Sequence, residues 1–167
     1  MFLLDTPIVL ELRKAKSGRT DPGLTRWAGE VPSQNLFLSA LSLMELETAV
    51  TQAGRRDRAA GQHLRDWLDQ RVVSAFEGRI LAVDAAVVRR RGQLGYADAR
   101  DGLLAATALE HNLTLVTRNL DAFKAGRVRL FNPWGYAPAA GAAETDADWR
   151  NAARTGTQWL RTLFLRL

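Results

Sequence analysis

The segment 101–119 constrains the fold of this chain more than any other stretch. It opens with an acid and continues through an apolar, alanine-rich run in which leucine and alanine recur with helical spacing, so one helix face is expected to pack inward. Asn112 predicts the end of this helix, because asparagine is common at the left-handed position after a helix. Leu113–Thr117 then suits a short buried strand of a parallel sheet. The segment therefore predicts one α/β unit.

The same alternation runs through the chain before and after this unit. The other expected strands cover residues 2–4, 36–39, 79–83 and 128–131, and the other main expected helices cover 7–14, 42–54, 59–76 and 84–95. Strands that alternate with helices predict an α/β sandwich around a mainly parallel central sheet.

The composition changes after Tyr136. Residues 137–143 are only alanine, proline and glycine, which predicts a linker, and 147–167 has the apolar spacing of an amphipathic helix. We therefore expect one domain over residues 1–136, followed by a linker and a helical extension over 137–167.

The composition of the 167 residues limits the classes of function. A hydrophobic content of 47% with 25% charged residues is typical of a globular protein, and the net charge of +5 favours a polyanionic partner such as nucleic acid. The absence of cysteine excludes disulfides, thiolate catalysis and a cysteine-ligated zinc site. The first residues do not have the pattern of a signal peptide, and no apolar run approaches the roughly 20 residues of a membrane span. We therefore expect a cytoplasmic protein with no membrane partner.

Three acids occupy equivalent points of the predicted fold. Asp5 ends the first strand, Glu45 lies in the first turn of the helix after the second strand, and Asp101 opens the helix of the unit described above. In an open α/β sheet, such positions face the crevice where ligands bind. Carboxylates that converge there repel one another unless a cation compensates, and Mg²⁺ or Mn²⁺ bound by them leaves coordination positions for a substrate phosphate. This arrangement predicts metal-assisted phosphodiester hydrolysis.

Each acid also has a purely structural interpretation. Asp5 is a possible cap of the first helix, and Glu45 is the third-residue partner of Ser42 in a capping box. Asp101 is a possible N-cap, and Asp98 is expected to have a structural role in the preceding loop.

Other polar and aromatic residues are expected mainly at the surface or in the core. Glu47 is expected to be a surface charge. The basic runs 55–58 and 89–91 are expected to be solvated, with RNA contact as the alternative, and Trp134 is expected in the core rather than stacked on a base. The chain has no glycine-rich phosphate loop, which argues against a nucleotide-binding or phosphotransferase protein.

Five motifs, taken together, resemble the PIN-domain ribonucleases of the VapC and FitB type. They are Leu-Leu-Asp5-Thr6, Leu-Ser39 with Met-Glu45-Leu, Asp101-Gly-Leu-Leu-Ala-Ala-Thr-Ala, Leu-Val-Thr117-Arg-Asn119 and Phe-Asn-Pro-Trp134. Their order and spacing match this family over residues 1–136, and the third and fourth motifs in tandem are the most specific.

The resemblance implies a PIN fold and an endoribonuclease that depends on Mg²⁺ or Mn²⁺. It implies that Asp5, Glu45 and Asp101 are catalytic and bind the metal, and that Asn119 occupies a fourth catalytic position that is often acidic in the family. The hydroxyls of Thr6 and Thr117 are then expected to support the site.

The resemblance also implies partners. The chain is expected to be the toxin of a toxin–antitoxin pair, with RNA as substrate. It is expected to form a homodimer and a toxin–antitoxin hetero-oligomer, in which a small antitoxin inserts a basic side chain among the carboxylates.

Two residues depart from the family pattern. Asn119 carries no charge, with Asp121 as the alternative acid, and Pro7 stands where the family commonly has an asparagine or serine that braces the site. These departures favour an alternative function, a catalytically weakened PIN-fold module that binds RNA or a partner without cutting. The extension over 137–167 has no counterpart in the family core, and its alternatives are packing on its own domain, pairing protomers, contacting the antitoxin, or no function.

Overall fold

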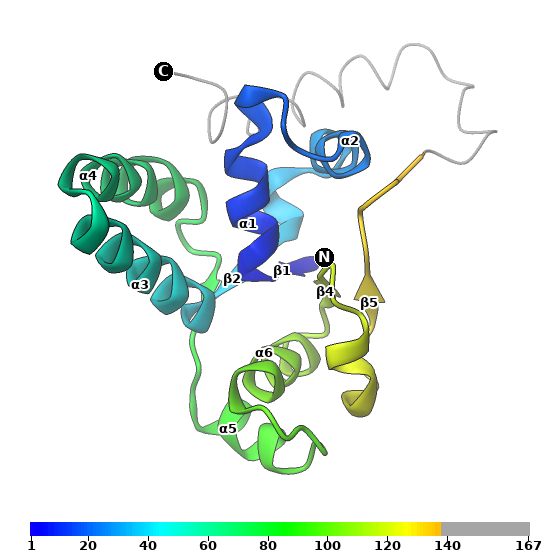
Figure 1. Ribbon diagram of the computed structural model, residues 1–167. Helices are drawn as coiled ribbons and strands as arrows, with labels where there is room; N and C mark the ends of the chain where they lie inside the picture. Colours follow the sequence, from blue (N-terminus) through cyan, green and yellow to red (C-terminus); the bar gives the residue numbers. More distant parts are fainter. Residues whose placement is uncertain (138–167) are drawn as a thin grey trace.

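A five-stranded parallel sheet lies at the centre of the computed structural model, which describes residues 1–137 (Figure 1). The strand order is β3-β2-β1-β4-β5, and all four pairings are parallel. The strands are β1 (Phe2–Leu4), β2 (Leu36–Ser39), β3 (Ile80–Leu81), β4 (Thr114–Val116) and β5 (Leu130–Phe131). The chain order reverses at β1, between β2 and β4, and the carboxyl ends of strands at such a switch point border the ligand crevice.

Within residues 1–137, six α-helices connect and follow these strands. They are α1 (Thr6–Arg13), α2 (Pro22–Glu30), α3 (Ala40–Arg56), α4 (Arg58–Trp67), α5 (Ala85–Gly92) and α6 (Ala99–Glu110). Short 3₁₀ turns cover Ala15–Ser17, Ser33–Asn35 and Asp121–Gly126, and α4 continues into a π-helical turn, Leu68–Val73. Over residues 1–137, no helix is both long enough and apolar enough to cross a bilayer.

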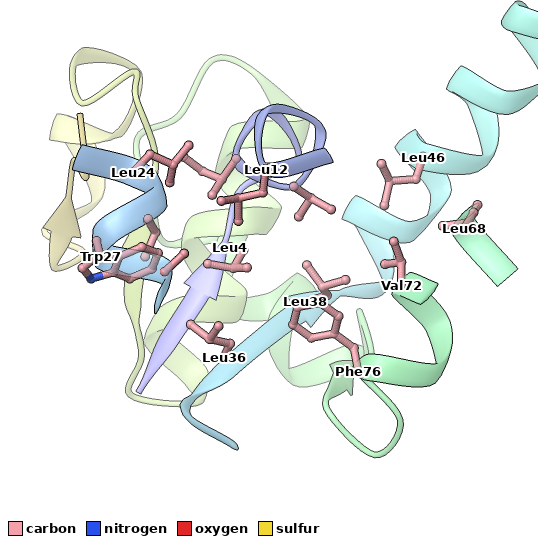
Figure 2. Close-up of a cluster of buried hydrophobic side chains, with 14 of the residues drawn as sticks. Leu4, Leu12, Leu24, Trp27, Leu36, Leu38, Leu46, Leu68, Val72 and Phe76 are labelled. Atoms are coloured by element: carbon pink, nitrogen blue, oxygen red, sulfur yellow. The ribbon is translucent and has the colours of Figure 1, made fainter. Parts of the chain in front are cut away.

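The helices cover both faces of the sheet, which follows from the alternation of side chains in β1. Leu3 and Leu4 are both buried, but they belong to different core clusters. Leu4 packs with side chains of α1, α2 and α3 (Figure 2), whereas Leu3 packs with side chains of α6 and with Phe123. Neighbouring strand residues point to opposite faces, so this division gives three layers. The predicted α/β/α sandwich is confirmed.

The beginning of α3 differs from the prediction. The helix starts at Ala40, directly after β2, and the Ser39 hydroxyl accepts a hydrogen bond from the Leu41 N–H at 3.2 Å. The predicted capping box of Ser42 and Glu45 is therefore wrong, because the last strand residue already supplies the cap. The Ser42 hydroxyl is buried and has no hydrogen-bond partner among the described residues. Glu45, in the second turn, has no capping role.

The beginning of α6 shows which of two acids, Asp98 or Asp101, caps this helix. Asp98 is the N-cap, and its carboxylate accepts a hydrogen bond from the Asp101 N–H at 2.9 Å. The structural role expected of Asp98 is confirmed, and the N-cap interpretation of Asp101 is wrong. Asp101 is the third helical residue, so its carboxylate is available for other contacts. The predicted end is confirmed, since Asn112 follows the helix with φ of 53°.

The end of the described chain is fixed against α2. The Asp21 carboxylate caps α2 by accepting from the Leu24 N–H and also accepts a hydrogen bond from the Gly135 N–H at 3.2 Å. A Cβ atom at Gly23 would lie 2.3 Å from the backbone nitrogen of Tyr136, so the two segments meet backbone to backbone. Trp134 packs against the core, as predicted. The linker and helical extension predicted for 137–167 lie outside the described residues.

Candidate active site

Three carboxylates from three separate elements converge at the carboxyl end of β1. Asp5 follows β1 directly, Glu45 comes from the second turn of α3, and Asp101 comes from the first turn of α6. The fold thus brings together the three acids that the sequence singled out. All three bind one guanidinium, that of Arg100. We call Arg100, Asp5, Glu45 and Asp101 the site cluster.

Arg100 uses all three of its side-chain nitrogens in the site cluster. Its Nη2 lies 2.5 Å from Asp5 Oδ1, its Nε lies 2.6 Å from Glu45 Oε1, and its Nη1 lies 2.8 Å from Asp101 Oδ1. A second bond joins Nη2 to Glu45 Oε2 at 3.1 Å. The planar fork of a guanidinium suits several carboxylates at once, so this one side chain holds the three acids together.

Two threonine hydroxyls add hydrogen bonds to Asp5 and Glu45. The buried Thr117 hydroxyl donates to Asp5 Oδ2 at 2.8 Å, and the Thr6 hydroxyl donates to Glu45 Oε2. These are the contacts expected of the two threonines. Asp5 occupies the N-cap position of α1, as its structural interpretation expected, but its side chain makes no capping hydrogen bond to the helix. Its carboxylate is nevertheless buried, at 4% exposure, and serves the site cluster.

The surroundings of Glu45 and Arg100 favour the charged forms of these two side chains. Burial raises the pKa of Glu45, but the hydrogen bonds from Arg100 and Thr6 and the positive charge of Arg100 outweigh burial, and the net pKa is lowered. Burial lowers the pKa of Arg100, but its hydrogen bonds to Glu45 and Asp101 and the charge of Asp5 outweigh burial, so the net pKa lies above the ordinary value of an arginine. At neutral pH the guanidinium is therefore a full positive charge facing an ionised Glu45.

Asn119 and Asp121 follow Thr117 in the sequence but make contacts outside the site cluster. The Asn119 amide oxygen accepts a weak hydrogen bond from the Ala122 N–H at 3.4 Å, and its own N–H donates to the Thr117 hydroxyl. Asp121 is exposed and pairs with Lys124. A catalytic role of Asn119 stays a prediction, and its backbone contact supports the site through Thr117.

An open groove of about 440 Å³ adjoins the site cluster along α1. It is lined by Thr6, Pro7, Leu10, Glu11, Lys14, Glu45 and Arg100. Pro7 lies at the start of α1 and borders this groove, where it offers an apolar surface instead of a hydrogen-bonding side chain.

The donor set of the site cluster fits a hard divalent cation in chemistry. It consists of carboxylate oxygens, the ligands that Mg²⁺ and Mn²⁺ prefer, and three of these oxygens already point at one cationic group. In the described part of the chain, however, no three acidic or histidine side chains are close enough together to hold a metal ion. The guanidinium lies between the carboxylates and sets their spacing.

Arg100 is the site residue that sequence reasoning missed. It is the second residue of α6, a position where the positive end of the helix dipole disfavours a cation. An arginine at this position, adjacent to a candidate metal ligand, was the signal available in the sequence.

Comparison with known proteins agrees with this geometry. The family model of the PIN domain matches residues 2–128. The chain belongs to the PIN-domain family.

Individual members of the PIN family show which of its proteins this chain is similar to. The chain is 34% identical over 143 residues to "Toxin FitB" of Neisseria gonorrhoeae, covering 80% of this chain and 99% of that protein. It is 31% identical over 145 residues to "VapC ribonuclease Y4jK" of Sinorhizobium fredii, covering 80% and 98%. A solved structure of FitAcB from Neisseria gonorrhoeae superposes with a TM-score of 0.71 at 31% identity, covering 80% of this chain and 99% of that chain. This PIN domain is therefore similar to VapC- and FitB-type toxins.

Proposed function

We propose that this PIN domain is a divalent-metal-dependent endoribonuclease and the toxin of a toxin–antitoxin pair. The observation that carries the proposal is the convergence of Asp5, Glu45 and Asp101, from three elements, on a single cation at the switch point of the sheet. The relative named a VapC ribonuclease supports the RNA-cleaving activity, and the relative named a toxin supports the biological role.

Asp5, Glu45 and Asp101 would hold Mg²⁺ or Mn²⁺. When bound, such an ion lowers the pKa of a water and offsets negative charge on a phosphodiester. The task of the protein is to orient the carboxylates. Thr117 fixes Asp5, Thr6 fixes Glu45, and the capped first turn of α6 fixes the backbone of Asp101. The predicted role of Asn119 in catalysis belongs to this proposal.

The proposed partners follow from the same similarity. RNA is the proposed substrate, and a small antitoxin is the proposed inhibitor, with a homodimer and a toxin–antitoxin hetero-oligomer as the assembled states. The net charge of +5 suits a polyanionic substrate.

The test is cleavage of a total cellular RNA pool by the purified, antitoxin-free chain with Mg²⁺, with Mn²⁺ and with EDTA. We expect discrete products that disappear with EDTA and with Asp101→Asn. Glu47→Gln is the matched control, because Glu47 lies on the same helix as Glu45 but binds Arg65 outside the site cluster. A folded wild-type protein that leaves every RNA intact under both metals would contradict the proposal.

A second candidate function is a PIN-fold module that binds RNA or a partner without cutting. The position of the Arg100 guanidinium among the carboxylates favours it, because a permanent guanidinium there would block a metal site. Retained RNA binding without turnover under either metal identifies this function.

A further inference from the structure

Arg100 belongs to the same chain as the acids that it binds, and this has a consequence for metal binding. We propose that Arg100 is a built-in competitor of the divalent cation, so that a metal ion binds only when the guanidinium leaves the site cluster. This inference rests on the proposed function, because it concerns the metal that the nuclease would use.

The competition follows from which carboxylate oxygens are occupied. Asp5 Oδ2 accepts a hydrogen bond from Thr117 and Glu45 Oε2 accepts one from Thr6, which leaves Asp5 Oδ1 and Glu45 Oε1 as the oxygens of these two side chains that have no hydroxyl donor. Those two oxygens are the ones that Arg100 binds, at 2.5 and 2.6 Å. A metal ion that binds these oxygens, or Asp101 Oδ1, would need lone pairs that Arg100 occupies.

Spacing makes the two cations mutually exclusive. Magnesium requires ligand oxygens at about 2.0–2.1 Å in near-octahedral geometry. A guanidinium holds its partner oxygens on three separate nitrogens, at 2.5–2.8 Å from each, and thereby keeps the carboxylates apart. The carboxylates can close around a small ion only after the planar group has moved out.

The groove along α1 gives the displaced side chain space and a new partner. Arg100 already lines this groove, and so does Glu11, whose carboxylate binds Lys14 at the surface. With 29% of its side chain exposed, Arg100 is not enclosed by the core and can turn outward by side-chain rotation. The exchange needs no change in the fold.

The proposed role differs from that of a simple structural ion pair in one measurable direction. Removing a structural arginine weakens or leaves unchanged the binding of any ligand nearby. Removing a competitor tightens the binding of the metal while it destabilises the metal-free protein.

The experiment is calorimetric titration of Mn²⁺ into the full, antitoxin-free chain, comparing wild type with Arg100→Gln and Arg100→Lys. We expect Arg100→Gln to lower the Kd for Mn²⁺ by about tenfold, which corresponds to a change of about 1.4 kcal/mol in binding. Arg100→Lys keeps one charge but not the three-nitrogen fork, so its Kd should lie between the two. Arg65→Gln is the matched control, since Arg65 also binds two acids, and its Kd should equal that of wild type.

Thermal unfolding gives the second readout. Without metal, Arg100→Gln should unfold at a lower temperature than wild type, and saturating Mn²⁺ should raise its midpoint by more than it raises that of wild type. If Arg100→Gln does not fold, the order of wild type and Arg100→Lys decides the question. A Kd for Mn²⁺ in the folded variants that equals or exceeds the wild-type value overturns the competition.

The outcome is separable from the test of nuclease activity. RNA cleavage by wild type together with an unchanged Kd in Arg100→Gln would overturn the competition alone. Tighter Mn²⁺ binding in Arg100→Gln without cleavage of any RNA would support the competition and overturn the nuclease. Absence of Mn²⁺ binding in wild type and in both Arg100 variants would overturn both.

Discussion

The protein contains two arginine-centred clusters with the same chemistry and different surroundings. In the site cluster, Arg100 binds three carboxylates that include the buried Asp5. In the other, which we call the surface cluster, Arg65 binds Glu47 through both guanidinium ends at 2.6 and 2.8 Å, and Asp69 at 3.4 Å. The side chains of Arg65, Glu47 and Asp69 are 34%, 44% and 53% exposed.

The difference lies in what holds each cluster in place. The surface cluster joins neighbouring turns and helices, α3 with α4 and its π-helical turn, across 4 and 18 residues of sequence. In the site cluster, Arg100 contacts Glu45 and Asp5 across 55 and 95 residues. Exposed ion pairs contribute little to stability and are screened by salt. The surface cluster is therefore explained as an ordinary pairing of surface charges. Three acids at the end of a central strand would repel one another without a cation, so the site cluster depends on Arg100 more than the surface cluster depends on Arg65.

Glu45 and Glu47 show how local the separation is. They are two residues apart on α3, so their side chains leave the helix about 200° apart. One faces the sheet switch point and the other faces α4. The expectation that Glu47 is a surface charge is confirmed.

Catalysis should separate the clusters most strongly. Asp5→Asn and Asp101→Asn should each lower the rate of RNA cleavage at least about a hundredfold, because each removes the charge of a proposed metal ligand while keeping the size of the side chain. Glu47→Gln, in the surface cluster, should cleave at the wild-type rate. Gel-based initial rates with Mg²⁺ measure both, and wild-type activity in Asp5→Asn would remove that carboxylate from the mechanism.

The second largest difference between the site cluster and the surface cluster is expected in the stability of the metal-free protein. Arg100→Ala should lower the free energy of unfolding by about 2 kcal/mol, because it leaves the buried Asp5 without its cation. Arg65→Ala should produce little change, since its partners are solvated. Urea unfolding in EDTA measures both, and equal losses in the two variants would mean that burial does not distinguish the clusters.

A smaller effect is expected for the hydroxyl that supports Asp5. Thr117→Val should lower the free energy of unfolding by about 1 kcal/mol, because the buried hydroxyl donates to Asp5 and accepts from the Asn119 N–H. Thr51→Val is its matched control, since the exposed Thr51 hydroxyl bonds only to the Glu47 carbonyl of its own helix. The same urea experiment compares the two variants. A free energy of unfolding in Thr117→Val equal to that of the wild type would show that water replaces the lost contact.

The smallest effect concerns the two glutamates, whose pKa values are both below the ordinary 4.5. For Glu47 the main cause is the hydrogen bond from Arg65, so Arg65→Gln should return its pKa toward 4.5. For Glu45 burial opposes the lowering, so Arg100→Gln should raise its pKa above that of the wild type. Carboxyl NMR titration without metal resolves both.

The lowered pKa values of Glu45 and Glu47 determine how the stability of the fold changes with pH. A carboxylate with a lowered pKa in the folded state stabilises the fold above its unfolded pKa and loses this contribution as the pH falls through the folded value. Each glutamate should therefore support the wild-type fold above pH 4.5 and less at lower pH, and each arginine variant should lose that dependence for its own partner. An unchanged Glu45 titration in Arg100→Gln would contradict the account of the site cluster.

The fold was predictable because its signals are local and repeated. Short apolar runs located the strands β1, β2 and β4, and Asn112 located the end of α6. The start of α3 was misplaced because Ser39 and Ser42 have the same capping chemistry. The end of the strand at Ser39 was predicted, but the sequence did not show that the helix follows it directly.

The candidate site was predictable in its acids and not in its cation. Asp5, Glu45 and Asp101 follow from their positions after or beside strands. Arg100 binds the carboxylate of the adjacent Asp101 and the distant carboxylates of Glu45 and Asp5. Helical periodicity predicts contacts between residues three or four apart, so it does not predict these.

The backbone-to-backbone contact of Gly23 with Gly135 and Tyr136 has a consequence for genetics rather than chemistry. Any side chain at position 23 would put a Cβ atom 2.3–2.8 Å from main-chain atoms of the crossing segment, and main chain cannot rotate away as a side chain can. In a saturation mutagenesis screen for toxicity, position 23 should therefore tolerate as few substitutions as the site cluster. Such variants should fail for a different reason, with low abundance rather than an inactive folded protein.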